Sequence, residues 1–436
     1  AMAEFRTPKG TRDILPPESA RWEVLVARFA GIVEAAGYGL VLSPLFENVE
    51  VFQRVGESTD IVRKEMYQFT DKGGRELALR PEGTASIVRA FVQHRPPTPW
   101  KTWYAAPSFR YEQAQAGRYR QHHQGGIEVL GTDDPDVDVE VIALAWEFFA
   151  AVGLRLITLK VNSLGDATCR PVYREALRAF LETRQDQLCD EHRTRWEENP
   201  LRVLDCKKAE CVAATADAPH QLDYLCDACA QHFARVLEGL TALDIPNVVD
   251  PRLVRGLDYY TRTTFEFASR ALESAQNALG GGGRYDGLVE EMGGPPTPGI
   301  GFGIGLDRTL LACNEEGILT IEELAPRIDV FVVDFAGGDG ARDITAQLRR
   351  VGVRTDRAFG GRSPKSQLKS ADRSGARLAL IIGPDEAASG RVAIKDLRSG
   401  PGTPQELVDR EALVKEIRRR LSSDAPTVGA ASILES

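Results

Sequence analysis

The feature that most constrains this fold is a pair of long strand-like segments, 101–111 and 119–130, joined by a seven-residue loop at 112–118. A parallel connection needs a dozen or more residues, so strands this close in the chain must pair as an antiparallel hairpin. Apolar residues at helical spacing predict a helix over 22–36 and another over 139–152.

Further strand patterns flank this hairpin. They are expected at 38–46, 154–162, 259–267 and 300–306, with a run of glycines at 280–283. Pro44 places the first of these strands at an edge or an interface, because proline cannot donate to a sheet ladder. The expected core is therefore α+β, with a mainly antiparallel sheet and flanking helices.

The pattern changes at two points further along the chain. The segment 166–250 is rich in Arg, Glu and Cys and mostly helical in pattern, which indicates an inserted module. Past Pro326, strands and helices alternate and end in a helix expected over 407–421, which predicts a small α/β domain with a mainly parallel sheet. The expected boundaries are 1–165 and 251–326 for the two parts of the core, 166–250 for the insertion, 327–421 for the C-terminal domain and 422–436 for a flexible tail.

Charge is distributed unevenly between these parts. The whole chain carries a net charge of −9, whereas 327–421 holds 19 basic and 13 acidic residues, a net charge of +6. A uniformly basic nucleic-acid coat is excluded, while the basic C-terminal domain fits either contact with a polyanion or a solvated charged face. Four of its basic residues recur at helical spacing and could face phosphates: Arg362, Lys365, Lys369 and Arg373.

Membrane and secretory signals are both missing from the pattern. No apolar run approaches the roughly 18 residues that a membrane helix needs. The N-terminal residues contain no apolar signal-peptide core, so we expect a cytoplasmic protein with no membrane association.

Four short motifs carry the residues best suited to chemistry. Phe109-Arg110-Tyr111-Glu112 precedes the hairpin loop, and Arg118 ends that loop. Arginine is a rigid bidentate donor for phosphate, although spacing alone favours a hairpin whose charges solvate one another. The other motifs are Arg80-Pro81-Glu82-Gly83-Thr84, Leu253-Val254-Arg255-Gly256-Leu257-Asp258-Tyr259-Tyr260, and the glycine-rich strand 299–305 followed by Arg308. A glycine-rich strand lets a flat ligand lie close to the backbone.

Taken in order, these motifs resemble those of histidyl-tRNA synthetases, a family of class II aminoacyl-tRNA synthetases. The segment from Phe109 resembles class II motif 2, and 299–308 resembles motif 3. Pro44 with its flanking strand resembles motif 1, which builds the dimer interface in this class. The Leu253–Tyr260 string resembles a signature specific to histidyl enzymes, and Gly281-Gly282-Gly283-Arg284-Tyr285-Asp286 adds to it.

The resemblance implies a histidine–tRNA ligase that works in two steps. L-histidine and ATP, with Mg²⁺, would give histidyl-adenylate and pyrophosphate, and the histidyl group would then pass to the terminal adenosine of tRNA(His). It also implies a homodimer, an insertion over the tRNA acceptor arm and a C-terminal anticodon-binding domain.

The resemblance also implies roles for individual residues. Arg110 and Arg255 would be catalytic at the α-phosphate, and the ATP site would consist of Arg110, Glu112, Arg118 and Arg308. Histidine would be bound by Glu82, Gly83, Thr84, Arg110, Gln124, Glu128, Arg255, Tyr259, Tyr260 and Tyr285. Two positions depart from the family pattern: Asp307 stands where glutamate is frequent, and His122 where an aromatic ring usually stacks on adenine.

Two alternatives stay open at this level. The same fold serves as a histidine-sensing regulatory subunit of ATP phosphoribosyltransferase, although that paralogue lacks the C-terminal domain. Five of the seven cysteines fall between Cys189 and Cys229. Together with His192, these cysteines could form a structural zinc site, or they could be buried free thiols. This group consists of Cys189, His192, Cys206, Cys211, Cys226 and Cys229. No residue of the active site is assigned as a metal ligand.

Overall fold

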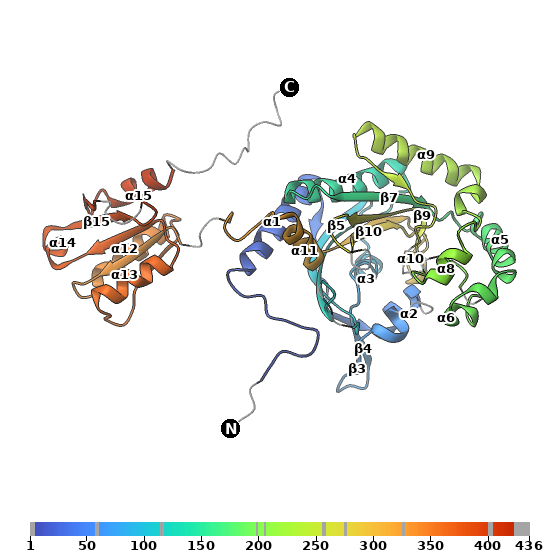
Figure 1. Cartoon of the computed structure of the whole chain (residues 1–436), viewed down its shortest axis with the longest axis horizontal. Helices are drawn as coiled ribbons and strands as arrows, with labels where there is room; N and C mark the ends of the chain where they lie inside the picture. The colour runs from blue at the N-terminus through green and yellow to red at the C-terminus, as the bar shows by residue number, and fades with distance from the viewer. Residues whose placement is uncertain are drawn as a thin grey trace. The chain divides into compact units, whose positions relative to one another are not determined.

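The computed structural model divides the chain into two compact units, Ala1–Glu323 and Leu324–Ser436 (Figure 1). It describes residues 5–56, 61–113, 115, 117–197, 199–204, 206–254, 259–273, 277–324, 328–399 and 404–422. None of the helices in these segments is both long and apolar enough to cross a bilayer.

The larger unit is built on an eight-stranded sheet in the order β1-β5-β6-β11-β10-β9-β7-β8. Its strands are β1 (Gly39–Leu40), β5 (Trp100–Phe109), β6 (Gln121–Leu130), β7 (Ile157–Ser163), β8 (Val248–Val249), β9 (Thr261–Ser269), β10 (Ala278–Arg284) and β11 (Gly299–Gly305). The predicted hairpin is present, because β5 and β6 pair antiparallel from Trp100 opposite Leu130 to Phe109 opposite Gln121. Only the short edge strands β1 and β8 pair in parallel, so the prediction of a mainly antiparallel core is confirmed.

Helices cover one face of this sheet. They include α1 (Ser19–Ala35), α4 (Pro135–Val152) and α9 (Asp227–Ala242). Phe29 of α1 packs edge-on against Phe148 of α4 and against Phe302 of β11. Since neighbouring side chains of a strand point to opposite faces, Gly301 and Gly303 belong to the other face, where the site lies.

That other face is bordered by a small second sheet and short helices. The sheet has the order β2-β4-β3, with β2 (Phe46–Asn48), β3 (Gln68–Thr70) and β4 (Glu76–Leu79). The helices are α2 (Val49–Gly56), α3 (Thr84–His94), α10 (Leu288–Glu291) and α11 (Leu306–Glu316), with a π-helical turn at Ile61–Glu65. The buried side chains of α2, α3 and α10, which include Phe52 and Phe91, form one core with Tyr259 and Tyr285.

The strand predicted over 38–46 is only partly right. Two short strands, β1 and β2, occur there, and Pro44 lies in the connection between them. β1 is an edge strand, as Pro44 indicated, and Leu40 and Leu42 on it and beside it are exposed.

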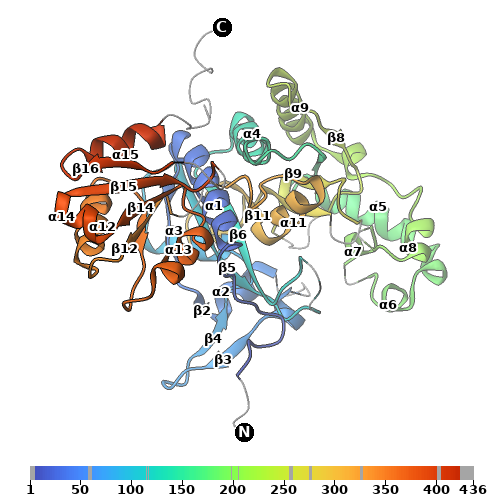
Figure 2. The ribbon, with the colours of Figure 1, turned by 60° about the vertical axis from the view of Figure 1, so that its left-hand side comes forward.

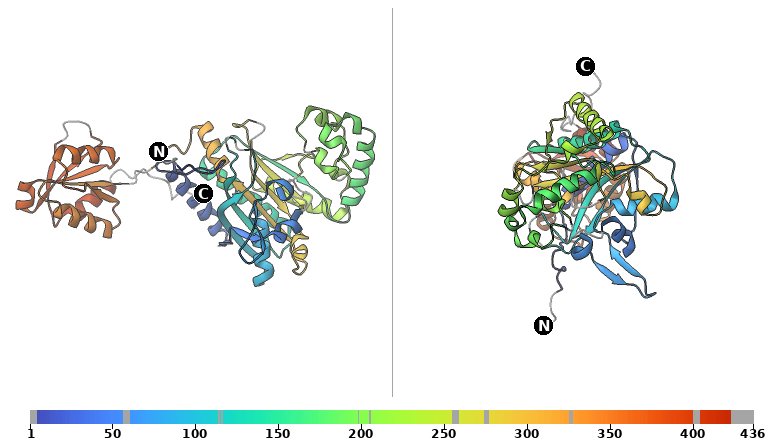
Figure 3. Two further views of the ribbon diagram at one scale, coloured as in Figure 1. Left: turned by 90° about the horizontal axis from the view of Figure 1, so that it is seen from below. Right: turned by 90° about the vertical axis from the view of Figure 1, so that its right-hand side faces the viewer.

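The insertion consists of helices, most of which lie beyond one end of the sheet (Figure 3). They are α5 (Arg170–Glu182), α6 (Asp190–Arg193), α7 (Leu201–Leu204), α8 (Ala209–Ala214) and α9, with 3-10 turns at Gln185–Gln187 and Gln221–Tyr224. A separate small core forms here around Tyr173, Leu177 and Trp196.

The C-terminal unit is a five-stranded sheet in the order β13-β12-β14-β15-β16, flanked by helices (Figure 2). Its elements are β12 (Val330–Asp334), α12 (Asp339–Arg350), β13 (Thr355–Arg357), α13 (Pro364–Arg373), β14 (Leu378–Ile382), α14 (Pro384–Ser389), β15 (Arg391–Asp396), β16 (Glu406–Asp409) and α15 (Leu413–Ser422). The expectation of a mainly parallel sheet is wrong: β12 pairs in parallel with β13 and β14, but β14, β15 and β16 pair antiparallel. The helix expected from Leu407 begins only at Leu413, because β16 occupies 406–409.

Candidate active site

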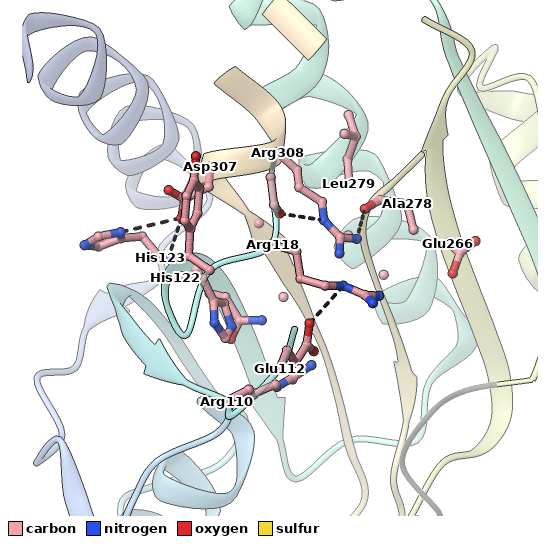
Figure 4. Close-up of a pocket in the computed structure, with 17 residues that line it drawn as sticks. Arg110, Glu112, Arg118, His122, His123, Glu266, Ala278, Leu279, Asp307 and Arg308 are labelled. Atoms are coloured by element: carbon pink, nitrogen blue, oxygen red, sulfur yellow. Dashed lines mark hydrogen bonds and ion pairs between the residues drawn. The ribbon is translucent and has the colours of Figure 1, made fainter. Parts of the chain in front are cut away.

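A pocket of about 210 Å³ opens on the sheet between the β5–β6 loop and the start of α11 (Figure 4). Its walls include all four residues expected at an ATP site: Arg110, Glu112, Arg118 and Arg308. Its lining also includes Gly280, Gly281, Gly303 and Gly305 on β10 and β11, and the missing side chains leave the sheet surface open.

Arg308 is held in place by backbone carbonyl groups. It lies in the first turn of α11, where its Nε donates to the Gly117 carbonyl at 3.1 Å and its Nη1 to the Ala278 carbonyl at 2.9 Å. Burial lowers the pKa of Arg308, and the nearby charge of Arg118 lowers it further. A buried cation beside a second cation favours an anionic ligand.

Arg110 stands on the opposite side of the same pocket. Its Nε donates to the Pro81 carbonyl at 2.9 Å, which fixes the guanidinium at the end of β5. Within the described segments, its two terminal nitrogens have no hydrogen-bond partner. They are therefore available to a ligand oxygen.

Glu112 and Arg118 pair with each other. The Arg118 Nε lies 2.8 Å from the Glu112 carboxylate, as the dashed line in Figure 4 shows. The charges of this hairpin thus partly satisfy one another, as the spacing alone suggested. A nucleotide that engages both residues must separate them.

His122 and Asp307, the two departures from the family pattern, play different parts. Burial lowers the pKa of His122 to about 3, so its ring is neutral at physiological pH and presents a flat surface in the pocket. Asp307 accepts the His123 backbone N–H at 2.8 Å and lies 3.7 Å from Arg12. Its carboxylate therefore joins β6, α11 and the N-terminal segment.

A second, buried group surrounds Glu128, four residues beyond the pocket residue Gln124 on the same face of β6. Thr84 Oγ1 donates to Glu128 Oε1 at 2.7 Å, and the Tyr285 hydroxyl donates to Oε2 at 2.5 Å. The Tyr104 hydroxyl is 3.4 Å from Oε1. Burial raises the pKa of Glu128 to about 8 despite these hydrogen bonds.

Glycine is required opposite this carboxylate. A Cβ on Gly301 would lie 1.9 Å from Glu128 Oε2 and 2.4 Å from the Ile127 carbonyl oxygen. Gly303, two residues along β11, would place its Cβ no closer than 3.8 Å to Gln124. The glycine pattern of 299–305 therefore has a specific structural reason at 301.

Glu82 is also buried, at the start of α3. Its carboxylate accepts the backbone N–H groups of Thr84 at 2.6 Å and Ala85 at 2.9 Å, and burial raises its pKa. Position 83 must also be glycine, because a Cβ there would lie 2.3 Å from the ring of Tyr104.

The tyrosines expected around histidine also come together. The rings of Tyr259 and Tyr260 are 4.6 Å apart, and those of Tyr259 and Tyr285 are 5.8 Å apart. All three are buried. Arg255, the second expected catalytic arginine, lies outside the described residues.

Arg284, in the glycine-rich signature, is structural. It is fully buried and lies 2.6 Å from Asp138 of α4, which also contacts His232 of α9 at 2.8 Å. This buried pair attaches β10 to the helices behind the sheet.

Sequence reasoning missed two residues of the site. Glu266 lines the pocket between Arg110 and Arg308, and the Tyr104 hydroxyl lies next to Glu128. The alternation of side chains along a strand could have indicated Glu266. Its neighbours Phe265 and Phe267 are fully buried on one face of the sheet, so Glu266 belongs to the other face, where the pocket lies. Nothing in the pattern singles out Tyr104.

The C-terminal unit has a pocket of its own, of about 570 Å³. Arg357, Phe359 and Arg362 line it, and the Arg357 guanidinium lies 4.6 Å from the ring of Phe359, which is 57% exposed. Lys365, Lys369 and Arg373 are exposed on α13, beside Arg362. An exposed aromatic ring between cations is typical of surfaces that stack unpaired bases.

Comparisons with known proteins agree over nearly the whole chain. The family model of histidyl-tRNA synthetase matches residues 10–309, and that of the anticodon binding domain matches 329–420. A histidine–tRNA ligase of Mycolicibacterium vanbaalenii is 49% identical over 97% of this chain and 99% of its own length, and one of Pelotomaculum thermopropionicum is 44% identical over 95% and 98%.

Solved structures give the same result. The apo histidyl-tRNA synthetase of S. aureus superposes with a TM-score of 0.80 at 35% identity, and covers 95% of this chain and 100% of its own. A Bacillus halodurans protein described as an ATP phosphoribosyltransferase regulatory subunit/histidyl-tRNA synthetase shares the fold at 20% identity and a TM-score of 0.62. The full-length relatives favour the synthetase interpretation over the regulatory one, and the chain belongs to the histidyl-tRNA synthetase family.

Proposed function

We propose that this chain is a histidine–tRNA ligase that forms histidyl-adenylate at the pocket between Arg110 and Arg308. The observation that carries the proposal is the position of these arginines on the sheet face that also holds the buried Glu128 network. One group offers cations for a polyphosphate, and the other offers buried polar atoms for a small polar side chain.

The first step joins two anions, so the task of the protein is to position them and neutralise their charge. A histidine carboxylate oxygen attacks the α-phosphorus of ATP, the bond from that phosphorus to the bridging oxygen breaks, and pyrophosphate leaves with both electrons of that bond. Arg110 would hold the α-phosphate and the carboxylate through its terminal nitrogens. Arg308 would take the γ-phosphate, and Arg255 would act at the α-phosphate as the family resemblance implies.

Nucleotide binding would rearrange the Glu112–Arg118 pair. Glu112 would then accept from the adenine amino group, and Arg118 would turn to the terminal phosphate. The ring of His122, neutral because of its lowered pKa, would stack on adenine without adding charge.

The pocket also offers a carboxylate suited to Mg²⁺. Glu266 of β9 lines the pocket beside the glycines of β10, and its carboxylate would hold the metal. Mg²⁺ is commonly held by one or two carboxylates together with substrate phosphates, whose charge it neutralises when bound.

Histidine would be selected by the buried group. Glu128 and Tyr260 would hold the two imidazole nitrogens, with Tyr259 and Tyr285 lining the pocket, while Glu82, Thr84 and Gln124 would accept from the α-ammonium group. Thr84 and Tyr285 donate to Glu128 in the structure, so they also orient its carboxylate. A site with buried polar groups rejects analogues that leave those groups unpaired.

The second step needs tRNA(His), and the remaining parts of the chain suit it. The exposed ring of Phe359 would stack on anticodon bases, and the basic residues of α13 would contact phosphates. The exposed Leu40 and Leu42 beside β1 would be covered in a homodimer, as the motif 1 resemblance implies. We expect the enzyme in the cytoplasm, where protein synthesis takes place.

The experiment is to measure the transfer of labelled histidine to tRNA(His) by the purified chain. The proposal predicts charging that requires ATP and is lost in Arg110→Ala. If histidine binds but neither wild type nor any variant charges tRNA, a sensing role replaces the enzymatic one.

A further inference from the structure

The insertion gathers three thiols and an imidazole at one point. The ligand atoms of Cys189, His192, Cys206 and Cys211 all lie within 4.8 Å of one another. Cys189 Sγ is 3.3 Å from His192 Nδ1, and Cys211 Sγ is 3.7 Å from the same nitrogen. The four residues come from three different helical turns, so the chain has folded back on itself to bring them together.

The two distances to His192 Nδ1 bracket the sulfur–nitrogen edge of a tetrahedral zinc site. With Zn–S distances of about 2.3 Å and Zn–N distances of about 2.0 Å, neighbouring ligand atoms of a tetrahedron lie roughly 3.5–3.8 Å apart. We propose that Cys189, His192, Cys206 and Cys211 bind a structural Zn²⁺ ion. Three thiolates and one imidazole complete its tetrahedral shell, so no position remains for a substrate.

A zinc ion here would stabilise helices that are too short to be stable alone. Helices α6 and α7 have four residues each and α8 has six, far below the roughly 12–15 residues at which isolated helices become marginally stable in water. Cys189 directly precedes α6, Cys206 follows α7 and Cys211 lies within α8. A metal bound by all three segments would contribute folding free energy that their short backbones cannot supply.

The surroundings also suit a thiolate-rich site. The backbone N–H of Cys189 donates to Cys211 Sγ at 3.3 Å, which stabilises a thiolate. Zn²⁺ with three thiolates carries a net charge of −1, and the ammonium of Lys208 lies within electrostatic reach of Cys189. Cys206 and His192 are partly exposed, which gives the ion a path of entry.

The second cysteine group is different and serves as a comparison. Asp166, Cys169, Cys226 and Cys229 also lie within 4.8 Å of one another. Here the Asp166 carboxylate accepts the Thr168 N–H at 2.9 Å and lies 3.6 Å from Arg262. It also lies 3.6 Å from the thiol of Cys169. Hydrogen bonds to one carboxylate account for this arrangement, so we assign zinc to the Cys189 group alone.

The zinc content of the full-length chain tests the assignment. The untagged protein, dialysed against metal-free buffer, should retain about one zinc ion per chain by mass spectrometry. Cys206→Ser should lose most of it. Cys226→Ser is the matched control, because Cys206 and Cys226 are both partly exposed thiols in a cluster of four, and it should keep its zinc.

Two outcomes would overturn the proposal: a wild-type chain that neither retains nor takes up zinc, or equal zinc loss in both variants. Two zinc ions, of which each variant loses one, would overturn the assignment of zinc to the Cys189 group alone. If Cys206→Ser does not fold, Co²⁺ loaded into the wild-type chain gives an independent test. Tetrahedral d–d bands with thiolate-to-metal charge transfer are expected, and an octahedral spectrum would contradict the site.

Discussion

Replacing Gly301 with alanine tests whether the position opposite Glu128 on β11 must lack a side chain. The new methyl carbon would lie 1.9 Å from Glu128 Oε2 and 2.4 Å from a backbone oxygen, so the side chain must yield. Restoring an ordinary separation of about 3.4 Å moves the carboxylate by about 1.5 Å. A displacement of that size breaks the hydrogen bonds from Thr84 and Tyr285, which are 2.7 and 2.5 Å long.

The expected cost follows from these contacts. Overpacking a well-filled site costs about 1–3 kcal/mol, and each broken hydrogen bond adds about 1 kcal/mol. We therefore expect a loss on the order of 3 kcal/mol, which should lower the Tm of the catalytic unit by about 5 °C or more. The KM for histidine should rise more than the KM for ATP.

Gly303→Ala is the matched control, two residues away on the same strand and face. Its methyl group meets nothing closer than 3.8 Å, so the Tm should stay within about 2 °C of wild type. Because Gly303 lines the nucleotide pocket, any kinetic change should fall on the KM for ATP. The steric argument is refuted if Gly301→Ala matches wild type in both Tm and KM for histidine.

Three further predictions concern charge and stacking. Glu128 keeps its proton up to about pH 8 when folded but releases it near 4.5 when unfolded, so its contribution to stability is lost as pH rises between these values. In thermal melts across that range, wild type should lose stability relative to Glu128→Gln by at most about 1.4 kcal/mol per pH unit, and parallel curves would contradict the raised pKa. Arg308→Ala should raise the KM for ATP about 10–100-fold in pyrophosphate exchange, as expected from losing a charge-assisted contact, and an unchanged KM would remove Arg308 from the phosphate site. Phe359→Ala should weaken tRNA charging about 10–100-fold by losing one stacked base while leaving tRNA-independent exchange intact, and equal loss in both assays would indicate misfolding instead.

Much of the core could be predicted because local patterns decide it. Two long segments with a short loop allow only a hairpin, and glycines at the ends of α1 and α4 mark where these helices stop. The C-terminal sheet was harder to predict. β16 has four residues, three of them exposed, so it carries no apolar pattern, and the sequence predicts the start of α15 there instead. Its antiparallel pairing with β15 depends on the tertiary fold.

In the candidate site, too, contacts between residues far apart in the sequence could not be predicted from local patterns. Arg110 and Arg308 are 198 positions apart in the sequence. Only the family resemblance, and not their spacing, therefore predicts that they lie in one site. The Glu112–Arg118 ion pair and the position of the Tyr104 hydroxyl next to Glu128 depend on cross-strand geometry that spacing does not contain. Likewise, the sequence grouped six possible ligands together, whereas the fold separates them into two clusters and adds Asp166 and Cys169 to one of these.

The most direct test of the central claim is amino-acid-dependent exchange of labelled pyrophosphate into ATP, run without tRNA on each of the twenty amino acids. The proposed chemistry predicts exchange with histidine alone, and its loss in Arg110→Ala under conditions where the variant keeps the wild-type Tm. Exchange with a different amino acid, or none with any while histidine still binds, would contradict the assignment of histidine activation to this pocket.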